Sequence, residues 1–312
     1  MRIEYHRTLI ADRVRIKAYH DALARVIRKG ETTVADIGTG TGILAFLAAK
    51  LGAKKVYAYE MAEIGAVAER LKSLNRVRNV ELIPGRSTDI IDPPRVDVVV
   101  TETLGNFALE EFLIETMNDA RARYLKPGGV LIPGTVTQFV APVLSPRLYE
   151  ELTAWDRVGF GLDLGPARDM SLNNVYIRTL KPAELLDGGR SSMTWDHVDF
   201  SKANRMTRKG SVEWSPTKAS TIHGLAVWWS AALAPDVTLS TSPMAEPTHW
   251  EQLFFPALEP ITLAAGETLT ADIHTKSTEA GGTDIAWSLA VATAKGKERV
   301  RQALSLAKGF LP

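Results

Sequence analysis

Two glutamates that stand nine positions apart could bind a planar cation. Glu102 follows an apolar, strand-like run, and Glu111 lies beyond a turn that contains Gly105. A hairpin-like loop would bring both carboxylates into one pocket, where two acids are costly unless a cation lies between them. A guanidinium meets this need because it offers five planar donors and pairs with carboxylates in a bidentate way. We interpret the adjacent Glu110 as a surface residue of the kind that favours the start of a helix.

A glycine-rich turn nearer the N-terminus could hold a nucleotide-like cofactor. Gly38, Gly40 and Gly42 follow Asp36, between a strand-like run and an Ala/Leu-rich helical run. Glycines let the backbone turn tightly and approach a ligand closely, and amides at the start of a helix can face a polar group. The third glycine comes one residue earlier than in the dinucleotide fingerprint. The pattern resembles the first motif of class I methyltransferases, with a nicotinamide site or a turn without ligand as the alternatives.

Further polar residues follow the next two strand-like runs. Glu60 ends the second run, where an acid can accept hydrogen bonds from both ribose hydroxyls. Ser87, Thr88 and Asp89 follow the third run, where adenine recognition would fall. Each of these three residues could equally do no more than cap a loop. Far downstream, His249 and Trp250 precede another strand-like run, and such a pair taken alone is most often structural.

The elements that must position these residues alternate between strands and helices in the first part of the chain. Helical spacing is expected for residues 6–29 up to Gly30, for 62–75, and for 109–125 up to Pro127-Gly128-Gly129. Strand-like runs occupy residues 33–37, 55–60, 80–83 and 96–101, and a fifth begins at 130. This alternation predicts a doubly wound parallel sheet, which binds ligands at the carboxyl ends of its strands.

After about residue 135 the chain changes character. Runs rich in Val, Thr and Trp alternate with loops rich in Pro, Gly and Ser, which predicts a mostly antiparallel β structure. These runs are Thr135–Val143, Leu225–Ala232, Trp250–Phe255, Leu269–His274 and Ile285–Thr293. We therefore expect an α/β protein, with a Rossmann-like domain over residues 1–134 and a mainly β domain over 135–312. Residues 160–192 lack apolar periodicity and could form a linker or an arm.

The composition narrows the classes of function. The 312 residues include no cysteine, which excludes disulfides, zinc–cysteine sites and thiol nucleophiles, and we expect no metal. The net charge of +1 lacks the basic excess typical of nucleic-acid binders. The charged N-terminal segment does not resemble a signal peptide, and no run of 18 apolar residues occurs. We expect a cytoplasmic protein that binds neither nucleic acid nor a membrane.

Four separated segments resemble the protein arginine methyltransferase family. That family has a "double-E" loop after its fourth strand, with the second glutamate nine residues after the first, as in Glu102 and Glu111. Its β-barrel domain carries a Thr-His-Trp loop, matched by Thr248, His249 and Trp250. The glycine turn is the third segment, and residues 6–15 are similar to the family's segment before the first strand. The resemblance spans roughly residues 6–275.

The resemblance implies both a cofactor and roles for several residues. The cofactor would be S-adenosylmethionine, with Arg15 at its carboxylate, and the enzyme would methylate a guanidino nitrogen of arginine in a protein or peptide. Asp12 would pair with His249, which would help proton release or join the two domains. Leu9 stands where the family has a Met or Phe that influences the methylation pattern. The second domain would be β-barrel-like, and residues 160–192 lie where the family inserts a dimerisation arm, so a homodimer is implied.

The sequence also departs from the family pattern. Thr103, Leu104 and Asn106 stand where the family has Trp, Met and Tyr. This less aromatic channel leaves room for another guanidine or amine, so a methyltransferase of a free amino acid or a natural-product intermediate is an alternative. The family's N-terminal helix, which folds over the cofactor, has little counterpart before His6, so either another element closes the site or the site closes on a substrate or a partner chain. An inactive, cofactor-binding partner subunit is a second alternative, against which the two intact glutamates argue.

Overall fold

The computed structural model describes residues 3–310, and its first part is a parallel five-stranded sheet in the order β3-β2-β1-β4-β5. Every neighbouring pair in this sheet is parallel. The central strands are apolar and buried because helices cover both faces of such a sheet. The strands are β1 (Thr33–Ile37), β2 (Lys55–Glu60), β3 (Val80–Pro84), β4 (Val96–Thr101) and β5 (Leu125–Ile132).

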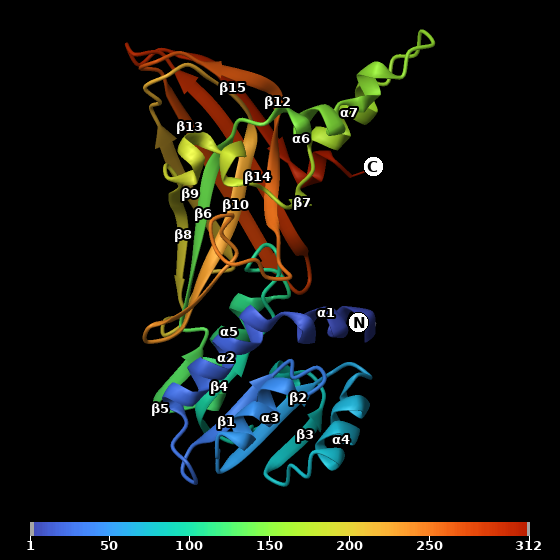
Figure 1. Cartoon of the computed structure of the whole chain (residues 1–312), viewed down its shortest axis with the longest axis vertical. Helices are drawn as coiled ribbons and strands as arrows, with labels where there is room; N and C mark the ends of the chain where they lie inside the picture. Colours follow the sequence, from blue (N-terminus) through green and yellow to red (C-terminus); the bar gives the residue numbers. More distant parts are fainter. Residues whose placement is uncertain (1–2, 311–312) are drawn as a thin grey trace.

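Helices and short turns connect these strands (Figure 1). They are α1 (Ile3–Ala11), α2 (Arg13–Val26), α3 (Ile43–Lys50), α4 (Gly65–Leu74), the 3-10 turn η1 (Ser87–Asp89), α5 (Leu113–Asp119) and the π-helical turn η2 (Ala120–Tyr124). A single helix over residues 6–29 was expected, and that expectation is wrong. Asp12 interrupts it, because its side chain accepts a hydrogen bond from the Arg15 amide and caps a new helix.

The predicted helix over residues 109–125 is also shorter than expected. Glu111 and Phe112 both have positive φ, at 54° and 60°, so α5 begins only at Leu113. Residues 127–129 do not end a helix, because they already lie within β5. The left-handed backbone at Glu111 places the second glutamate on an irregular turn before the helix, and this turn is part of the site described below.

The second part of the chain forms two antiparallel sheets. One has the order β7-β12-β10-β6-β8, with β11 paired to β10, and the other has the order β15-β14-β13-β9. The strands are β6 (Thr135–Val143), β7 (Tyr176–Arg178), β8 (Met193–Asp199), β9 (Thr207–Trp214), β10 (Ser220–Ala234), β11 (Val237–Ser240), β12 (Gln252–Leu263), β13 (Thr268–Thr278), β14 (Gly282–Ala292) and β15 (Glu298–Ser305). The five predicted runs overlap β6, β10, β12, β13 and β14, whereas the other strands were not predicted.

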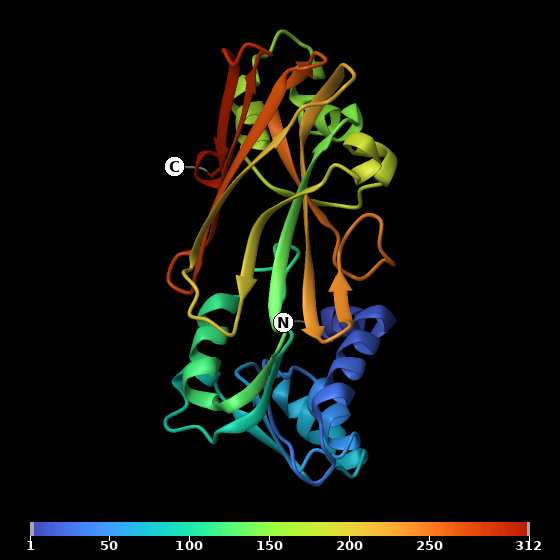
Figure 2. The ribbon, with the colours of Figure 1, turned by 90° about the vertical axis from the view of Figure 1, so that its left-hand side faces the viewer.

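The edge strands β8 and β9 of the two sheets lie side by side, and on the other side β12, which is next to the edge strand β7, lies beside β15, so the result is barrel-like (Figure 2). Large buried side chains such as Trp229, Phe255 and Trp287 lie between the sheets, where the ring centroids of Phe255 and Trp287 are 5.2 Å apart. The last parallel strand ends at Ile132 and the first antiparallel strand begins at Thr135. We keep 1–134 and 135–312 as the proposed domain division because the sheet type changes there.

An arm projects from the β half beside its upper end (Figure 1). It contains α6 (Pro146–Leu152), a 3-10 turn η3 (Ala154–Arg157) and α7 (Gly165–Leu172). The arm therefore begins before residue 160, and the predicted region 160–192 also includes β7 and two further 3-10 turns, η4 (Pro182–Glu184) and η5 (Leu186–Gly189). Between residues 3 and 310, no helix has both the length and the apolar content needed to span a membrane.

The two halves meet at the loop that follows β4. The indole N–H of Trp229 donates to the carbonyl of Gly105 at 3.0 Å, and that of Trp250 donates to the carbonyl of Leu104 at 2.9 Å. The side-chain oxygen of Asn106 accepts the Glu251 amide at 2.9 Å. The β half thus fixes the backbone of the loop that separates the two glutamates.

We expect Trp229→Phe to lower the free energy of unfolding by about 1–3 kcal/mol, because the buried Gly105 carbonyl loses its donor. Chemical denaturation measures this change. Trp155→Phe is the control, since that indole is on the arm and 41% exposed. An equal loss in both variants would contradict the importance of the Trp229 hydrogen bond.

Candidate active site

A cavity of about 420 Å³ lies at the carboxyl ends of β1 to β4. Its lining includes the glycine turn after β1, Glu60 at the end of β2, and both Glu102 and Glu111 from the loop after β4. Residues from distant parts of the sequence therefore converge on one site, as expected for a parallel sheet. The predicted cofactor residues other than Gly42 and Asp89 line this cavity together with the predicted cation-binding glutamates.

The glycine turn adopts a backbone that other residues would strain. Gly38, Gly40 and Gly42 have φ values of 73°, 57° and 87°. A Cβ atom at Gly38 would lie 2.9 Å from the Thr103 methyl group, so the turn also packs closely against the glutamate loop. Alanine at any of the three positions would combine backbone strain with a steric conflict.

Asp36 stabilises the glycine turn through hydrogen bonds. Its Oδ2 accepts hydrogen bonds from the Thr39 hydroxyl at 2.6 Å and from the Ala45 amide at 2.9 Å. The residue is 1% exposed, and burial raises its pKa to about 6. Its Oδ1 is buried without a hydrogen-bond partner among residues 3–310. Since Asp36 also lines the cavity, this oxygen is available to a donor group on a ligand.

Glu60 also stabilises the glycine turn through hydrogen bonds. Its two oxygens accept the Gly40 amide and the Ala62 amide, each at 2.8 Å. The carboxylate is thereby fixed at the edge of the cavity, where a ribose would bind next to the glycines. A carboxylate oxygen has more than one acceptor site, so these two bonds leave capacity for ribose hydroxyls.

His6 belongs to the site and was not predicted as a site residue. It lies on α1, is 7% exposed and packs over the turn, since a Cβ at Gly40 would lie 3.2 Å from its ring. Its Nε2 is buried with no partner in the described chain, and burial lowers its pKa. His6 and Leu9 both line the cavity, and their three-residue spacing on one helix face was the available signal. Helix α1 therefore covers the glycine turn, where the sequence predicted little counterpart of the family's N-terminal helix.

The residues predicted to recognise adenine do not all reach the cavity. Ser87 and Thr88 line it, whereas Asp89 is not among the lining residues. The Ser87 carbonyl is held by Arg123 at 2.9 Å and by the Tyr124 hydroxyl at 2.5 Å. Ser87 therefore belongs to a rigid wall of the cavity.

Arg15 and Glu102 form a buried ion pair. The Arg15 Nε donates to Glu102 Oε2 at 2.7 Å, and Nη2 contacts the same oxygen. The remaining Nη1 donates to the Leu9 carbonyl at 3.0 Å. Burial raises the pKa of Glu102 to about 7, although the Arg15 guanidinium opposes this increase. Arg15 lines the cavity, so the residue predicted to meet a cofactor carboxylate here also contacts the first glutamate.

The second glutamate is at the mouth of the same cavity. Glu111 is exposed, and partial burial of its carboxyl together with the charge of Glu60 raises its pKa. The two predicted clamp residues therefore differ, because Glu102 is held by an arginine in the interior and Glu111 faces the opening. A cation that enters from solvent would meet Glu111 first.

Glu110 is not the surface residue that the sequence suggested. It is only partly exposed, and its carboxyl packs against Gly105, where any side chain would collide with it. Burial raises the pKa of Glu110 to about 7. The turn before α5 folds this side chain back over the loop, which a helix beginning at residue 109 would not have done.

Asp12 connects the first half to the Thr-His-Trp loop. Its Oδ2 accepts hydrogen bonds from the His249 amide and from His249 Nδ1, both at 2.8 Å. Burial opposes its ionisation, but the bonds from His249 and from the Arg15 amide outweigh burial and lower the pKa. The predicted contact is thus present, while the role of His249 stays a prediction. Thr248, His249 and Trp250 lie behind the cavity and are not among its lining residues.

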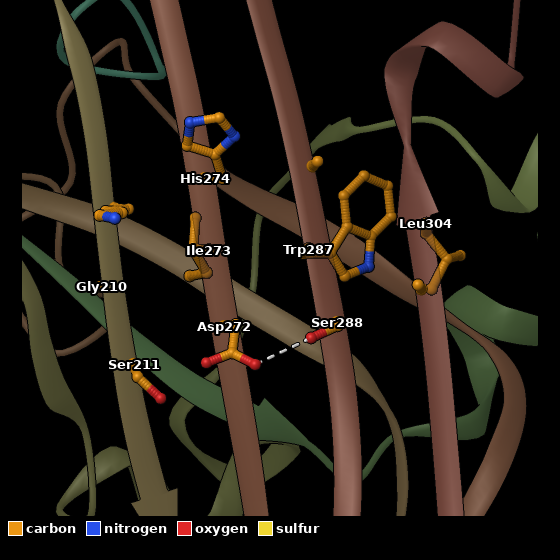
Figure 3. A pocket seen from close by; sticks show the side chains of 11 residues that line it. Gly210, Ser211, Asp272, Ile273, His274, Trp287, Ser288 and Leu304 are labelled. Carbon is orange, nitrogen blue, oxygen red and sulfur yellow. Dashed lines mark hydrogen bonds between the residues drawn. The ribbon is translucent and has the colours of Figure 1, made fainter.

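A second, larger cavity of about 550 Å³ lies on the four-stranded sheet (Figure 3). Its side chains include Ser211 of β9, Asp272 and His274 of β13, and Ser288 of β14, which donates to Asp272 at 3.1 Å. None of the predicted site residues borders it. We therefore take the 420 Å³ cavity as the active-site candidate.

Known proteins resemble both halves of the chain. Residues 135–300 match the family described as PRMT5 oligomerisation domain, and residues 18–138 match ribosomal protein L11 methyltransferase (PrmA). Protein arginine N-methyltransferase 6 of Xenopus laevis is 30% identical over 285 residues, which cover 87% of this chain and 83% of the frog protein. Protein arginine N-methyltransferase 1 of Dictyostelium discoideum is 28% identical and covers 85% and 79%, respectively.

Solved structures share the fold. A Trypanosoma brucei PRMT1 enzyme-prozyme heterotetrameric complex with AdoHcy has a chain that superposes with a TM-score of 0.83 at 24% identity, covering 97% of this chain and 98% of the other. Protein arginine methyltransferase 10 of Arabidopsis thaliana gives 0.82 at 24% identity, with 98% of each chain covered. The fold and the relatives define a methyltransferase. Within that class, the chain belongs to the protein arginine methyltransferase family.

Glu110→Gln is expected to stabilise the protein at neutral and alkaline pH. A carboxyl whose pKa is raised from 4.5 to about 7 binds its proton more tightly in the folded state, so its contribution to stability falls as pH rises between these values. The melting temperature of the variant should exceed that of the wild type at pH 8 and match it below pH 4.5. Glu31→Gln, at an exposed site, is the control. A variant that is less stable than the wild type at pH 8 would refute the explanation.

Proposed function

We propose that this protein transfers a methyl group from S-adenosylmethionine to a guanidino nitrogen of arginine in a protein or peptide. The observation that carries the proposal is the shared cavity, in which Glu102 and Glu111 face the same space as the Gly38–Gly42 turn. Membership of the family and the names of the relatives support the same reaction. The charged N-terminal segment favours a cytoplasmic protein, and the net charge of +1 argues against a nucleic-acid substrate.

The residues of the cavity fit the proposed cofactor. Buried polar atoms without partners in the described chain, Asp36 Oδ1 and His6 Nε2, belong to residues that line the cavity and are suited to polar groups of a ligand. Glu60 would accept the ribose hydroxyls, and Arg15 would share its charge between Glu102 and the cofactor carboxylate. Ser87 and Thr88 would border the adenine. When bound, the cofactor supplies a methyl group on a positively charged sulfur.

The two glutamates would position the guanidinium. Glu102 accepts from one side at the buried end, and Glu111 accepts from the mouth, so one nitrogen is directed at the methyl group while positive charge gathers on the others. Since burial raises the pKa of Glu102 to about 7, the clamp is fully charged only above that pH. The Asp12–His249 pair would keep the β half in place behind the loop or help to remove the released proton.

We expect Glu102→Gln to lower kcat by at least about 100-fold while leaving cofactor binding within a few fold of the wild type. Glutamine keeps the shape of the side chain but cannot balance the guanidinium charge. Transfer of isotope-labelled methyl groups to an arginine-rich peptide pool, to free arginine and to a cell lysate measures activity, and calorimetry with S-adenosylhomocysteine measures binding. Glu267→Gln, at the ion pair with Arg299 in the β half, is the matched control.

If Glu102→Gln retained wild-type activity, the proposal that Glu102 and Glu111 position the guanidinium would be wrong. Label confined to free arginine or other small molecules would keep the reaction but exclude a protein substrate. Label in the peptide pool that disappears in Glu102→Gln would establish arginine methylation of proteins or peptides.

We also propose that the protein forms a homodimer through the arm. Large apolar side chains are exposed there, with Phe160 at 95% and Leu162 at 63%. Arg168 anchors the arm, because it pairs with Asp156 at 3.0 Å and with Glu259 of β12 at 2.7 Å. An exposed apolar arm on a fixed base is suited to pack against a second copy.

Phe160→Asp combined with Leu162→Asp is therefore expected to shift the protein from dimer to monomer. A charge placed in an apolar contact opposes association because it would be buried without a partner. Light scattering after size-exclusion chromatography measures the mass, and Ile91→Asp, at another exposed apolar site, is the control. An unchanged mass in the arm variant would show that the arm does not hold the assembly together.

A further inference from the structure

The tip of the β13–β14 hairpin reaches across to the parallel-sheet half (Figure 2). Glu279 at this tip makes two contacts there. Its carboxylate forms an ion pair with Arg86, which follows β3. Its backbone amide donates to Glu115 Oε2 of α5 at 2.9 Å. All three residues line the 420 Å³ cavity, so the hairpin forms part of the wall of the proposed active site.

Arg86 stands at the end of the cavity where adenine would bind. It directly precedes Ser87 and Thr88, and its Nη2 lies 3.9 Å from the sulfur of Met61, which follows Glu60. The guanidinium is therefore placed over the gap between the ends of β2 and β3. A planar guanidinium stacks well on a flat aromatic ring, and the ion pair with Glu279 fixes its orientation.

Glu115 connects the hairpin tip to the side of the cavity where Glu111 would bind the substrate. It lies in α5, four residues after Glu111, and its carboxylate accepts the hairpin amide instead of remaining free in solvent. A single hairpin tip thus contacts the proposed adenine end through Arg86, and through Glu115 it contacts α5, the helix that follows the turn bearing Glu111.

We infer that the tip of the β13–β14 hairpin is a latch that closes the adenine end of the cavity, with Arg86 contacting the cofactor and Glu279 acting as a positioning residue through Arg86. The inference rests on the proposed function, because it assumes that the cofactor occupies this cavity. The cofactor enters and leaves when the Arg86–Glu279 pair opens.

The solvent exposure of the Arg86–Glu279 ion pair determines how strongly its loss should weaken cofactor binding. The side chains of Arg86 and Glu279 are 27% and 54% exposed, and such partly exposed pairs make small contributions. Breaking the pair should therefore leave the fold intact and weaken cofactor retention by about 2- to 5-fold, mainly through faster dissociation. The effect should diminish at 1 M salt, where exposed charges are screened.

The test compares the full-length wild type with Glu279→Gln, Arg86→Gln and the double variant. Calorimetry and stopped-flow displacement with S-adenosylhomocysteine give the affinity and the dissociation rate, and circular dichroism confirms folding. Glu298→Gln, which breaks an exposed ion pair with Arg301 on β15, is the matched control. We expect faster dissociation in Glu279→Gln, a larger effect in Arg86→Gln, and a double variant no weaker than Arg86→Gln alone, because Glu279 acts through Arg86.

Two results would overturn the latch. One is a dissociation rate in Glu279→Gln that equals those of the wild type and Glu298→Gln. The other is strict additivity of the two single variants, which would make their effects independent. Failure of the wild type to bind S-adenosylhomocysteine would instead refute the proposed function itself, and the latch with it.

Discussion

The geometry of this protein depends on how the loop between Glu102 and Glu111 is held. The loop leaves a buried parallel strand, and its backbone carbonyls accept the indole N–H groups of Trp229 and Trp250 from the β half. Buried carbonyls need such donors, so these two hydrogen bonds are required wherever the β half packs over the loop. The parallel sheet directs the loop towards the cavity, and the β half fixes its shape. Neither half alone would place the carboxylates of both Glu102 and Glu111 in the cavity.

This arrangement gathers acidic groups where water is largely excluded. Burial raises the pKa of Asp36, Glu102 and Glu110, and partial burial raises that of Glu111. Arg15 offsets part of the cost at Glu102, and the backbone amides of Gly40 and Ala62 stabilise Glu60. The remaining cost is greatest at the carboxylates that have no cationic partner among residues 3–310. Such a cavity favours a positively charged ligand, because a bound cation offsets the repulsion between the neighbouring carboxylates.

The sequence predicted the parallel sheet and the convergence of its carboxyl ends because both follow from short-range patterns. The positions of the glycine turn, Glu60 and the two glutamates depend on strands that are strongly apolar. The errors arose where a side chain or an unusual backbone angle decides the structure. Asp12 caps a helix in the middle of a continuous helical pattern, and Glu111 and Phe112 adopt positive φ without a glycine. Glu110 and Arg86 depend on contacts with distant segments, which no local pattern contains.

The cavity wall is assembled from both ends of the chain. His6 of α1 covers the glycine turn, and Glu279 of the β13–β14 hairpin also lines the cavity, whereas all five strands of the parallel sheet are complete by Ile132. During synthesis the sheet can therefore form long before its binding site is finished. Until the β half has left the ribosome, the glutamate loop lacks its indole donors and the cavity lacks one wall. The complete cavity can therefore bind a ligand only after the β13–β14 hairpin has been made.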